Sequence, residues 1–455
     1  MKRELALTRL ILCLLVSCLL FVTTLHAQEP AASTETPGHP FSIKNTWIIG
    51  GAGPWDYLTM DTRAERLYIA HNHVVQVVDV TTGAVTGEIK GLTDAHSIAL
   101  DDTGEFGYVS DGRGGKVIVF DRRTLQTVAT IENVPSPRAL VFEPQTRLLF
   151  AVRADLAAPP PPANIPRTTT HITPRPAPPA PPPKPNTGSS ITVIDTQTKR
   201  VAGQILLPDA LGFAQADGRG NLYVDAPDRN RILVIDAQAV AGLITKPPEG
   251  ATTASESAPG PASGPAPGPE PGPAPGPAPS SSSSAAASAP AKESAVPVTI
   301  DWTERGRPVR SFALDGQCTP KSLAIDSAHS RLFAACDNLK LLVLNADNGN
   351  LLATLPIGYD VDAVGYDANH GLIYAANGGP EGSLTIIRQH ITDSYAVIQT
   401  LPTRQRARTL AVDQDTGKVY LVTDLLGMDL SKPGGIGTLQ TTPLNGSFQV
   451  LVVGN

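Results

Sequence analysis

The chain has 455 residues, with 36 Lys and Arg against 42 Asp and Glu, and its formal net charge at pH 7 is −6. A mildly acidic chain lacks the basic surface with which proteins wrap nucleic acid, so we expect no nucleic-acid partner. With 40 Gly, 43 Pro and 5% aromatic residues, the composition favours short strands joined by tight turns over a helical fold.

Residues 1–27 have the pattern of a secretory signal peptide. Three basic residues precede an apolar run over residues 10–25, and small residues near Ala27 offer a cleavage site. A lipoprotein signal ending at Cys18 is the alternative, but the apolar run continues beyond that residue. Cleavage would remove a net charge of +2 and leave −8. Because no second run could span a bilayer, we expect an exported chain, periplasmic or secreted, without a transmembrane segment.

Residues 28–40 read as a flexible segment, and beyond them one pattern recurs seven times. Each copy has an apolar stretch, an acidic residue, a turn and a strand led by an aromatic residue. The acids are Asp61, Asp101, Glu143, Asp217, Asp326, Asp367 and Asp413. Their spacings are 40, 42, 74, 109, 41 and 46 residues, and the two long gaps contain proline-rich segments. Without those segments the period is that of a four-stranded propeller blade. We predict an all-β fold, a single seven-bladed β-propeller over residues 41–455.

The second copy shows the repeating unit most clearly. Its expected strands are Ser97–Leu100, Gly107–Ser110, Lys116–Phe120 and Thr127–Ile131, which are rich in Val, Ile and Tyr. In five copies an acid or amide follows the third strand, namely Asp79, Asp121, Asp195, Asp236 and Asn345. Such side chains bond their own turn backbones, so we give these five a structural role.

Two segments have compositions that do not pack. Residues 157–188 carry proline runs, and residues 246–296 carry Gly-Pro and Ala-Pro repeats followed by serines. We expect both to be extended and disordered. The first interrupts blade 3 between its second and third strands, and the second interrupts blade 4 between its third and fourth, so they leave from opposite faces. A third long loop, Asp424 to Gly446, should share the face of the first.

The two ends of the chain predict how the ring closes. The last copy supplies strands around Thr409–Val412, Val419–Val422 and Phe448–Val453, and then the chain stops one strand short. The missing strand is available around Ile43–Ile49. Pairing it with the last copy would complete blade 7 and remove two free edges.

The aromatic-led strands resemble the YVTN family of bacterial β-propellers, which includes YncE-like proteins. The motif stands at Tyr68-Ile69-Ala70-His71, Tyr108-Val109-Ser110-Asp111, Tyr374-Ala375-Ala376-Asn377 and Tyr420-Leu421-Val422-Thr423. The resemblance implies an exported, WD40-like propeller and a binding or scaffold role more readily than a reaction. Lactonase-type propellers and the propeller domains of haem d1 and quinone enzymes are broader lookalikes, but the chain has no Cys-x-x-Cys-His haem site.

One column of the aligned copies predicts a ligand site. Five residues before each acid stand Asp56, His96, Arg138, Gly212, Lys321, Asp362 and Arg408. Six of these seven are polar or charged, whereas the position two residues later is apolar in every copy. The column should line the mouth of the central channel, where charge in a concave setting focuses the field on a ligand.

The hairpin register proposes partners for this column. If Asp101 faces Phe106, the opposed pairs are Asp56 with His71, His96 with Asp111, Asp362 with Asn377, and Arg138 with Arg153. Two arginines at the mouth, with Lys321 and Arg408 on the rim, would suit a carboxylate or phosphate. Alternatively, Asp155 or Asp111 neutralises the arginines.

A second grouping near the mouth combines imidazoles with a carboxylate. His71, His73 and His96 with Asp56 could hold a divalent metal such as Zn²⁺, or could activate a water. Ordinary Asp–His hydrogen bonds explain the pattern equally well. No other cofactor is expected.

Only Cys318 and Cys336 remain after signal cleavage. Disulfides persist in exported proteins, and the register places both cysteines near the top of blade 5. The sequence leaves open whether they are joined.

These observations predict an exported, non-catalytic propeller that binds a small anionic ligand or an envelope protein at its channel mouth, as a monomer. One alternative is a lactonase-like or metal-assisted hydrolase at the same face. Another is a cell-envelope interaction scaffold that uses the proline-rich loops.

Overall fold

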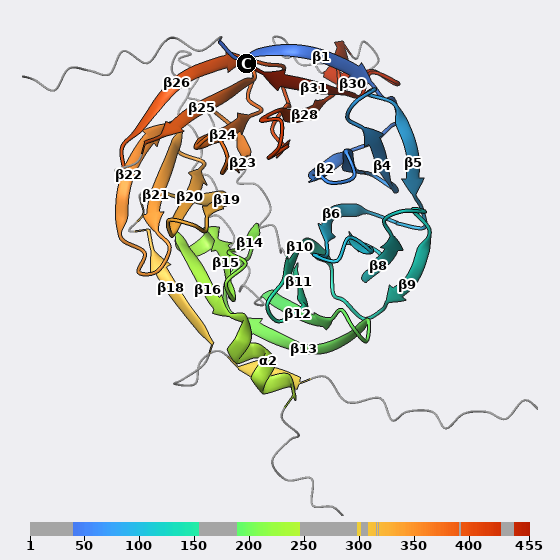
Figure 1. Ribbon diagram of the computed structural model, residues 1–455, viewed down its shortest axis with the longest axis vertical. Coiled ribbons are helices and arrows are strands. Elements are labelled where there is room, and N and C mark those ends of the chain that lie inside the picture. Colours follow the sequence, from blue (N-terminus) through green and yellow to red (C-terminus); the bar gives the residue numbers. More distant parts are fainter. Residues whose placement is uncertain are drawn as a thin grey trace, which may run out of the picture. The chain divides into compact units, whose positions relative to one another are not determined.

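Seven four-stranded blades surround a central channel in the unit Phe41–Gly454 (Figure 1). The structure, a computed structural model, describes residues 40–153, 189–245, 298–301, 308–314, 316, 318–390, 393–428 and 441–455. The expected signal peptide 1–27, residues 28–39 and the proline-rich segments 157–188 and 246–296 lie outside the described residues. The prediction of an all-β, seven-bladed propeller is confirmed.

The first three blades follow one another from the channel outwards. Blade 1 contains β2 (Trp55–Asp61), β3 (Arg66–His71), β4 (Val74–Asp79) and β5 (Val85–Ile89). Blade 2 contains β6 (Ala95–Leu100), β7 (Phe106–Asp111), β8 (Lys116–Asp121) and β9 (Thr127–Ile131). Blade 3 contains β10 (Pro137–Glu143), β11 (Leu148–Arg153), β12 (Ser189–Asp195) and β13 (Arg200–Leu207), with β17 (Val298–Asp301) parallel to β13 as a fifth strand.

The remaining blades repeat this order. Blade 4 contains β14 (Ala214–Ala216), β15 (Asn221–Ala226), β16 (Arg231–Asp236) and β18 (Val309–Ala313). Blade 5 contains β19 (Pro320–Asp326), β20 (Arg331–Cys336), β21 (Lys340–Asn345) and β22 (Leu351–Pro356). Blade 6 contains β23 (Val361–Asp367), β24 (Leu372–Asn377), β25 (Ser383–Gln389) and β26 (Tyr395–Pro402). Blade 7 contains β27 (Leu410–Val412), β28 (Val419–Thr423), β31 (Gln449–Gly454) and β1 (Ser42–Ile48).

Blade 7 joins the two ends of the propeller unit, as predicted. Strand β1 pairs antiparallel with β31, with Ile43 opposite Val453 and Ile48 opposite Gln449 (Figure 1). The small hairpin of β29 (Leu426–Met428) and β30 (Thr441–Pro443) lies between β28 and β31 in the chain. Closure therefore depends on a strand that is more than 350 residues distant from the rest of its blade.

Two short helices interrupt the strand pattern in blade 4, and the sequence did not predict them. They are η1 (Pro227–Arg229) and α2 (Ala237–Thr245). Asp236, expected only to close a turn, accepts a hydrogen bond from the Ala239 N–H at 2.9 Å at the start of α2. The buried Val240 packs into the core between blades 3 and 4. No helix in the described parts of the chain is long and apolar enough to cross a bilayer.

The seven repeated acids hold the turns between first and second strands. All seven are buried, with exposed fractions of 0–6%. Asp101 accepts the Gly104 N–H at 3.1 Å, and Asp367 accepts the His370 N–H at 3.1 Å. These acids serve the fold, and the turns they close lie on the side of the ring that we call the turn face. The opposite side, where each inner strand begins, is the mouth face.

The aromatic residue that leads each second strand fills the core between neighbouring blades. These residues are Tyr68, Tyr108, Phe150, Tyr223, Phe333, Tyr374 and Tyr420, and none is more than 1% exposed. The ring of Tyr68 in blade 1, for example, lies 5.6 Å from that of Phe120 in blade 2. The repeated motif is thus a packing feature, and it carries no site by itself.

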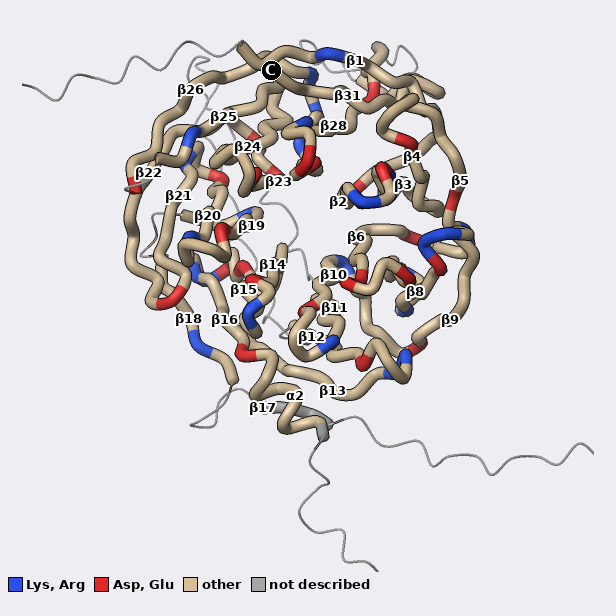
Figure 2. Tube along the Cα trace, in the orientation of Figure 1, with Lys and Arg blue, Asp and Glu red and all other residues tan. Residues whose placement is uncertain are grey.

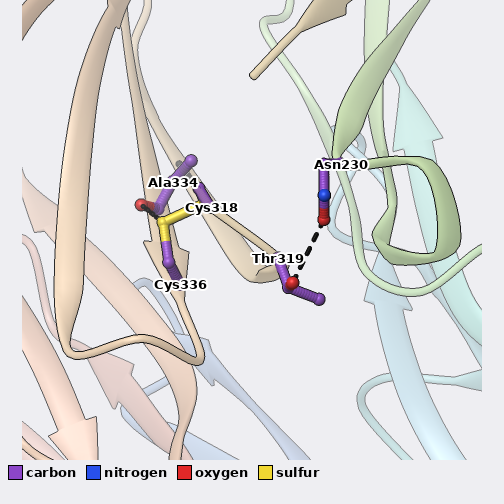
Figure 3. The surroundings of a disulfide bond; sticks show 5 residues. All are labelled: Asn230, Cys318, Thr319, Ala334 and Cys336. Atoms are coloured by element: carbon purple, nitrogen blue, oxygen red, sulfur yellow. Dashed lines mark hydrogen bonds between the residues drawn. A yellow bond between two sulfur atoms is a disulfide. The ribbon is translucent and has the colours of Figure 1, made fainter. Parts of the chain in front are cut away.

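A disulfide joins Cys318, which precedes β19, to Cys336 at the end of β20 (Figure 3). The two residues are 18 apart in sequence. The adjacent Thr319 Oγ1 donates to Asn230 Oδ1 at 3.1 Å, which links the start of blade 5 to blade 4 (Figure 3).

Replacement of both cysteines by serine should lower the free energy of unfolding by about 3 kcal/mol, because the unfolded chain regains the freedom of the open loop. Urea unfolding of a chain that starts at residue 28, measured with and without reductant, checks this expectation. Reductant should destabilise the wild type and leave the double variant unchanged. Equal midpoints for the two proteins under oxidising conditions would contradict it.

Candidate functional site

The predicted column of polar residues lies at the start of the inner strands, on the mouth face. We call these seven residues the mouth ring: Asp56, His96, Arg138, Gly212, Lys321, Asp362 and Arg408. The apolar position two residues further on is buried in every blade, at Leu58, Ile98, Leu140, Ala214, Leu323, Val364 and Leu410. Acidic and basic residues are interspersed along the chain around the channel, so the surroundings of the channel are neither uniformly acidic nor uniformly basic (Figure 2).

The predicted partners of the mouth ring are wrong by one residue. His71 lies opposite Trp55 rather than Asp56, and Asp111 lies opposite Ala95 rather than His96. In blades 3, 5 and 6 the same shift puts Pro137 opposite Arg153, Pro320 opposite Cys336 and Val361 opposite Asn377. The cause is a β-bulge at the start of each of these five inner strands, which inserts one extra residue.

The bulge changes what the mouth-ring residues do. In blades 3, 5 and 6 the extra residue is Arg138, Lys321 or Asp362, and it has no partner in the pairing of first and second strands. A bulged residue is released from the ladder and its side chain is re-aimed. The opposed arginines expected at positions 138 and 153 are therefore not a cross-strand pair.

Two aromatic rings meet across the channel just inside the mouth ring. Tyr57 from β2 lies with its ring centroid 5.2 Å from that of Phe213, which precedes β14 on the far side of the propeller. Burial raises the pKa of Tyr57 well above its usual value, and so do Asp56, Asp362 and Asp225, while Arg138 lowers it. Residues from blades 1, 3, 4 and 6 thus converge on one phenol.

Beyond this aromatic pair the channel encloses about 420 Å³. Inner-strand residues of all seven blades line it, including Met60, Leu100, Phe142 and Leu410, but no residue of the mouth ring does. Tyr57 and Phe213 themselves belong to this lining. The mouth ring and the channel are consequently lined by different sets of residues.

His96 is held between two carboxylates. Its Nδ1 lies 2.6 Å from Asp56 Oδ2 and its Nε2 lies 3.2 Å from Asp94 Oδ2, and the side chain is 7% exposed. Since both ring nitrogens have a partner, an Asp–His–Asp hydrogen-bond chain accounts for the residue.

The other predicted metal ligands point elsewhere. His71 Nδ1 lies 2.8 Å from Gln76 Oε1 and its ring packs on Phe448, whereas His73 Nδ1 lies 2.8 Å from the Thr93 carbonyl. The structure does not bring His71, His73 and His96 together, and among the described residues no three His, Cys, Asp or Glu side chains form a metal-binding group. Both carboxylate oxygens of Asp111 accept backbone N–H groups, from Thr93 and Asp94. Asp155, the other acid expected to neutralise the arginines, lies outside the described residues.

Blades 6 and 7 meet at the mouth through an ion pair. Arg408 Nε lies 3.1 Å from Asp362 Oδ2, and 35% of the Asp362 side chain remains exposed. Protein nevertheless surrounds Asp362 at the narrow mouth, so desolvation raises its pKa to about 6, against the opposing effect of Arg408.

When folding raises the pKa of an acid, the native state binds a proton at a higher pH than the unfolded state does. The free energy of unfolding therefore rises as pH falls through that pKa. We expect the wild type to gain thermal stability relative to Asp362→Asn as pH falls from 7.5 to 5. Melting curves of both proteins across this range measure the difference. A difference that stays constant with pH would show that Asp362 titrates normally.

Sequence reasoning missed one deeply buried acid of the mouth, Asp225 on β15. It is 1% exposed, and among the described residues no donor meets either carboxylate oxygen with hydrogen-bond geometry. Burial raises its pKa well above the usual value, while the Phe213 N–H, Lys321 and the Gly212 N–H act in the opposite direction.

A signal for Asp225 was present in the aligned copies. The equivalent second-strand positions hold Ala70, Ser110, Val152, Ala335, Ala376 and Val422. Blade 4 has an acid in this small-residue column, and it has glycine where the other blades have a polar mouth-ring residue. A Cβ atom added at Gly212 would lie 2.2 Å from Asp225 Oδ1. The carboxylate therefore takes the space of the missing seventh side chain.

Comparison with known proteins supports the architecture. No protein-family model and no curated protein matches the chain. One chain of a crystal structure of the mitotic checkpoint complex is similar with a TM-score of 0.54 at 12% identity, covering 86% of this chain and 91% of that one. The structure of U3-55K is similar with a TM-score of 0.56 at 9% identity, covering 90% and 98%. At such low identities these similarities show that the chain has a WD40-type β-propeller fold.

Proposed function

We propose that the chain is an exported propeller of the YVTN-like group that binds a small anionic ligand, or an acidic group of a protein partner, at its mouth ring. The observation that carries this proposal is the convergence of charged side chains from different blades at the mouth. Arg138, Lys321 and Arg408 supply positive charge there, and Tyr57 and Phe213 meet behind them. A basic side chain in a confined, partly desolvated mouth attracts a carboxylate or phosphate more strongly than one on an open surface.

Export is supported by two independent features. Residues 1–27 have the composition of a signal peptide, and the paired Cys318 and Cys336 form the kind of bond that persists in oxidising compartments. Binding without chemistry is the simpler assignment because both nitrogens of His96, the imidazole nearest the mouth, are held by carboxylates.

Thermal-shift and calorimetric titrations with acetate, succinate and inorganic phosphate test the binding proposal on a chain that starts at residue 28. A ligand of the native state raises the melting temperature. Arg138→Ala should weaken binding about tenfold or more, since a charge-assisted hydrogen bond is lost. Arg123→Ala is the matched control, because it removes the same charge from an exposed position on the turn face.

An anion that binds the wild type and the Arg123 variant equally, and the Arg138 variant weakly, would support the proposal. Absence of any shift across the panel, or equal losses in both variants, would overturn it.

A further inference from the structure

Asp225 is a buried acid outside the set of seven repeated acids. The seven repeated acids bond their own turns, whereas neither oxygen of Asp225 meets a donor with hydrogen-bond geometry among the described residues, and the nearby N–H groups of Phe213 and Gly212 only lower its pKa. A buried, unpartnered carboxylate is unfavourable, and a donor or counter-charge from outside the chain would relieve that cost.

The position of the carboxylate directs that group to the mouth. Oδ1 occupies the space into which a side chain at Gly212 would project, and position 212 belongs to the mouth ring. Gly212 itself is only half-buried. Both oxygens are covered, so a ligand at the mouth reaches Asp225 only when a neighbouring side chain moves aside, and Gly212 has no side chain that must move.

The charges around Asp225 are mixed. Lys321 lowers the pKa of Asp225 and Asp362 raises it, which places one positive and one negative side chain near this carboxylate. Lys321 is exposed and forms no salt bridge within 4.0 Å with any carboxylate in the described parts of the chain. Asp362, by contrast, already has Arg408. The mouth thus offers an exposed ammonium on β19 of blade 5 and a buried carboxylate on β15 of the neighbouring blade 4.

We propose that the mouth ring binds a small zwitterion, with the ligand's ammonium group on Asp225 and its carboxylate on Lys321 or Arg138. This inference rests on the proposed function and narrows its ligand to the amino-acid class. An ammonium group donates up to three hydrogen bonds and can meet both empty oxygens of Asp225. A metal ion would need a set of ligands that the described residues do not assemble.

Calorimetric titration with glycine, β-alanine and 4-aminobutyrate tests the proposal, because the series varies the distance between ammonium and carboxylate. Butyrate and butylammonium are the matched controls that carry one charge each. We expect one zwitterion to bind at least tenfold more tightly than either control. Asp225→Asn, which keeps the side-chain shape, should abolish that advantage. Asp102→Asn removes an equal charge from the turn face and should preserve it.

Lys321→Met provides a second variant at an exposed position, should Asp225→Asn fail to fold. It should weaken the zwitterion and butyrate together, and leave butylammonium unaffected. Equal binding of butyrate and 4-aminobutyrate, insensitive to Asp225→Asn, would overturn the zwitterion and leave anion binding standing. No binding by any zwitterion or by butyrate would overturn both.

Discussion

Replacement of Arg122 by alanine is expected to lower the free energy of unfolding by about 3–5 kcal/mol, the range for removing one partner of a buried ion pair. Its guanidinium lies at the turn face between blades 1 and 2 and is 10% exposed. Nη2 lies 2.5 Å from Asp61 Oδ2, and Nη1 donates to the Asp101 carbonyl at 3.0 Å. Without it, Asp61 remains buried with no counter-charge.

Equilibrium unfolding in urea measures this loss. Arg123→Ala, one residue further along on the exposed side of the same turn, is the control and should change stability by less than about 0.5 kcal/mol. An additional Asp61→Asn change should recover part of the loss, because it removes the unpaired buried charge. Equal stabilities of the two arginine variants would show that the pair does not hold the blades together.

Removal of β1 is expected to have a larger effect and to abolish cooperative folding. A chain that starts at residue 50 leaves the outer edge of β31 unpaired and loses Phe41, which is 7% exposed and packs on Tyr374. It also loses Trp47, which stacks on Tyr420 at 5.9 Å. Loss of the buried Phe41 alone corresponds to about 3 kcal/mol or more, and a typical domain has only about 5–15 kcal/mol in total.

The comparison protein is a chain that starts at residue 40, which keeps every described strand. Circular dichroism melting should show a sharp transition for this protein and a broad, weak one for the shorter chain. A synthetic peptide of residues 40–49 should restore the sharp transition by pairing with β31. Identical melting curves without the peptide would mean that the ring closes without β1.

The sequence was sufficient for features that repeat. Seven copies of one acid-and-turn pattern predicted seven blades, and the unmatched strand near residue 43 predicted how they close. Hydrophobic alternation also distinguished the buried column at Leu58 and its equivalents from the mouth ring. These features depend on the local spacing of residue types, which can be read directly from the sequence.

Features that depend on a single residue or on distance were harder to predict. A bulge adds one residue to a strand without changing its composition, so the pairing of Asp56 with His71 was predicted one position out. The disulfide remained open because its formation depends on the separation of two Cα atoms, which is 5.1 Å in the structure. Asp225 was not predicted as a mouth residue because it departs from the repeat, whereas an alignment of the copies emphasises what they share.

Ligand binding at the mouth ring should be sensed at Tyr57, because Asp56, Asp362 and Arg138 of that ring all shift the pKa of its phenol. The chain has nine tyrosines, and labelling with 3-fluorotyrosine gives each a fluorine resonance that Tyr57→Phe would assign. We expect 4-aminobutyrate or butyrate to shift the Tyr57 resonance and to leave the buried Tyr68, Tyr108 and Tyr420 unchanged. A Tyr57 resonance that stays fixed while calorimetry records binding would place the ligand elsewhere and contradict binding at the mouth ring.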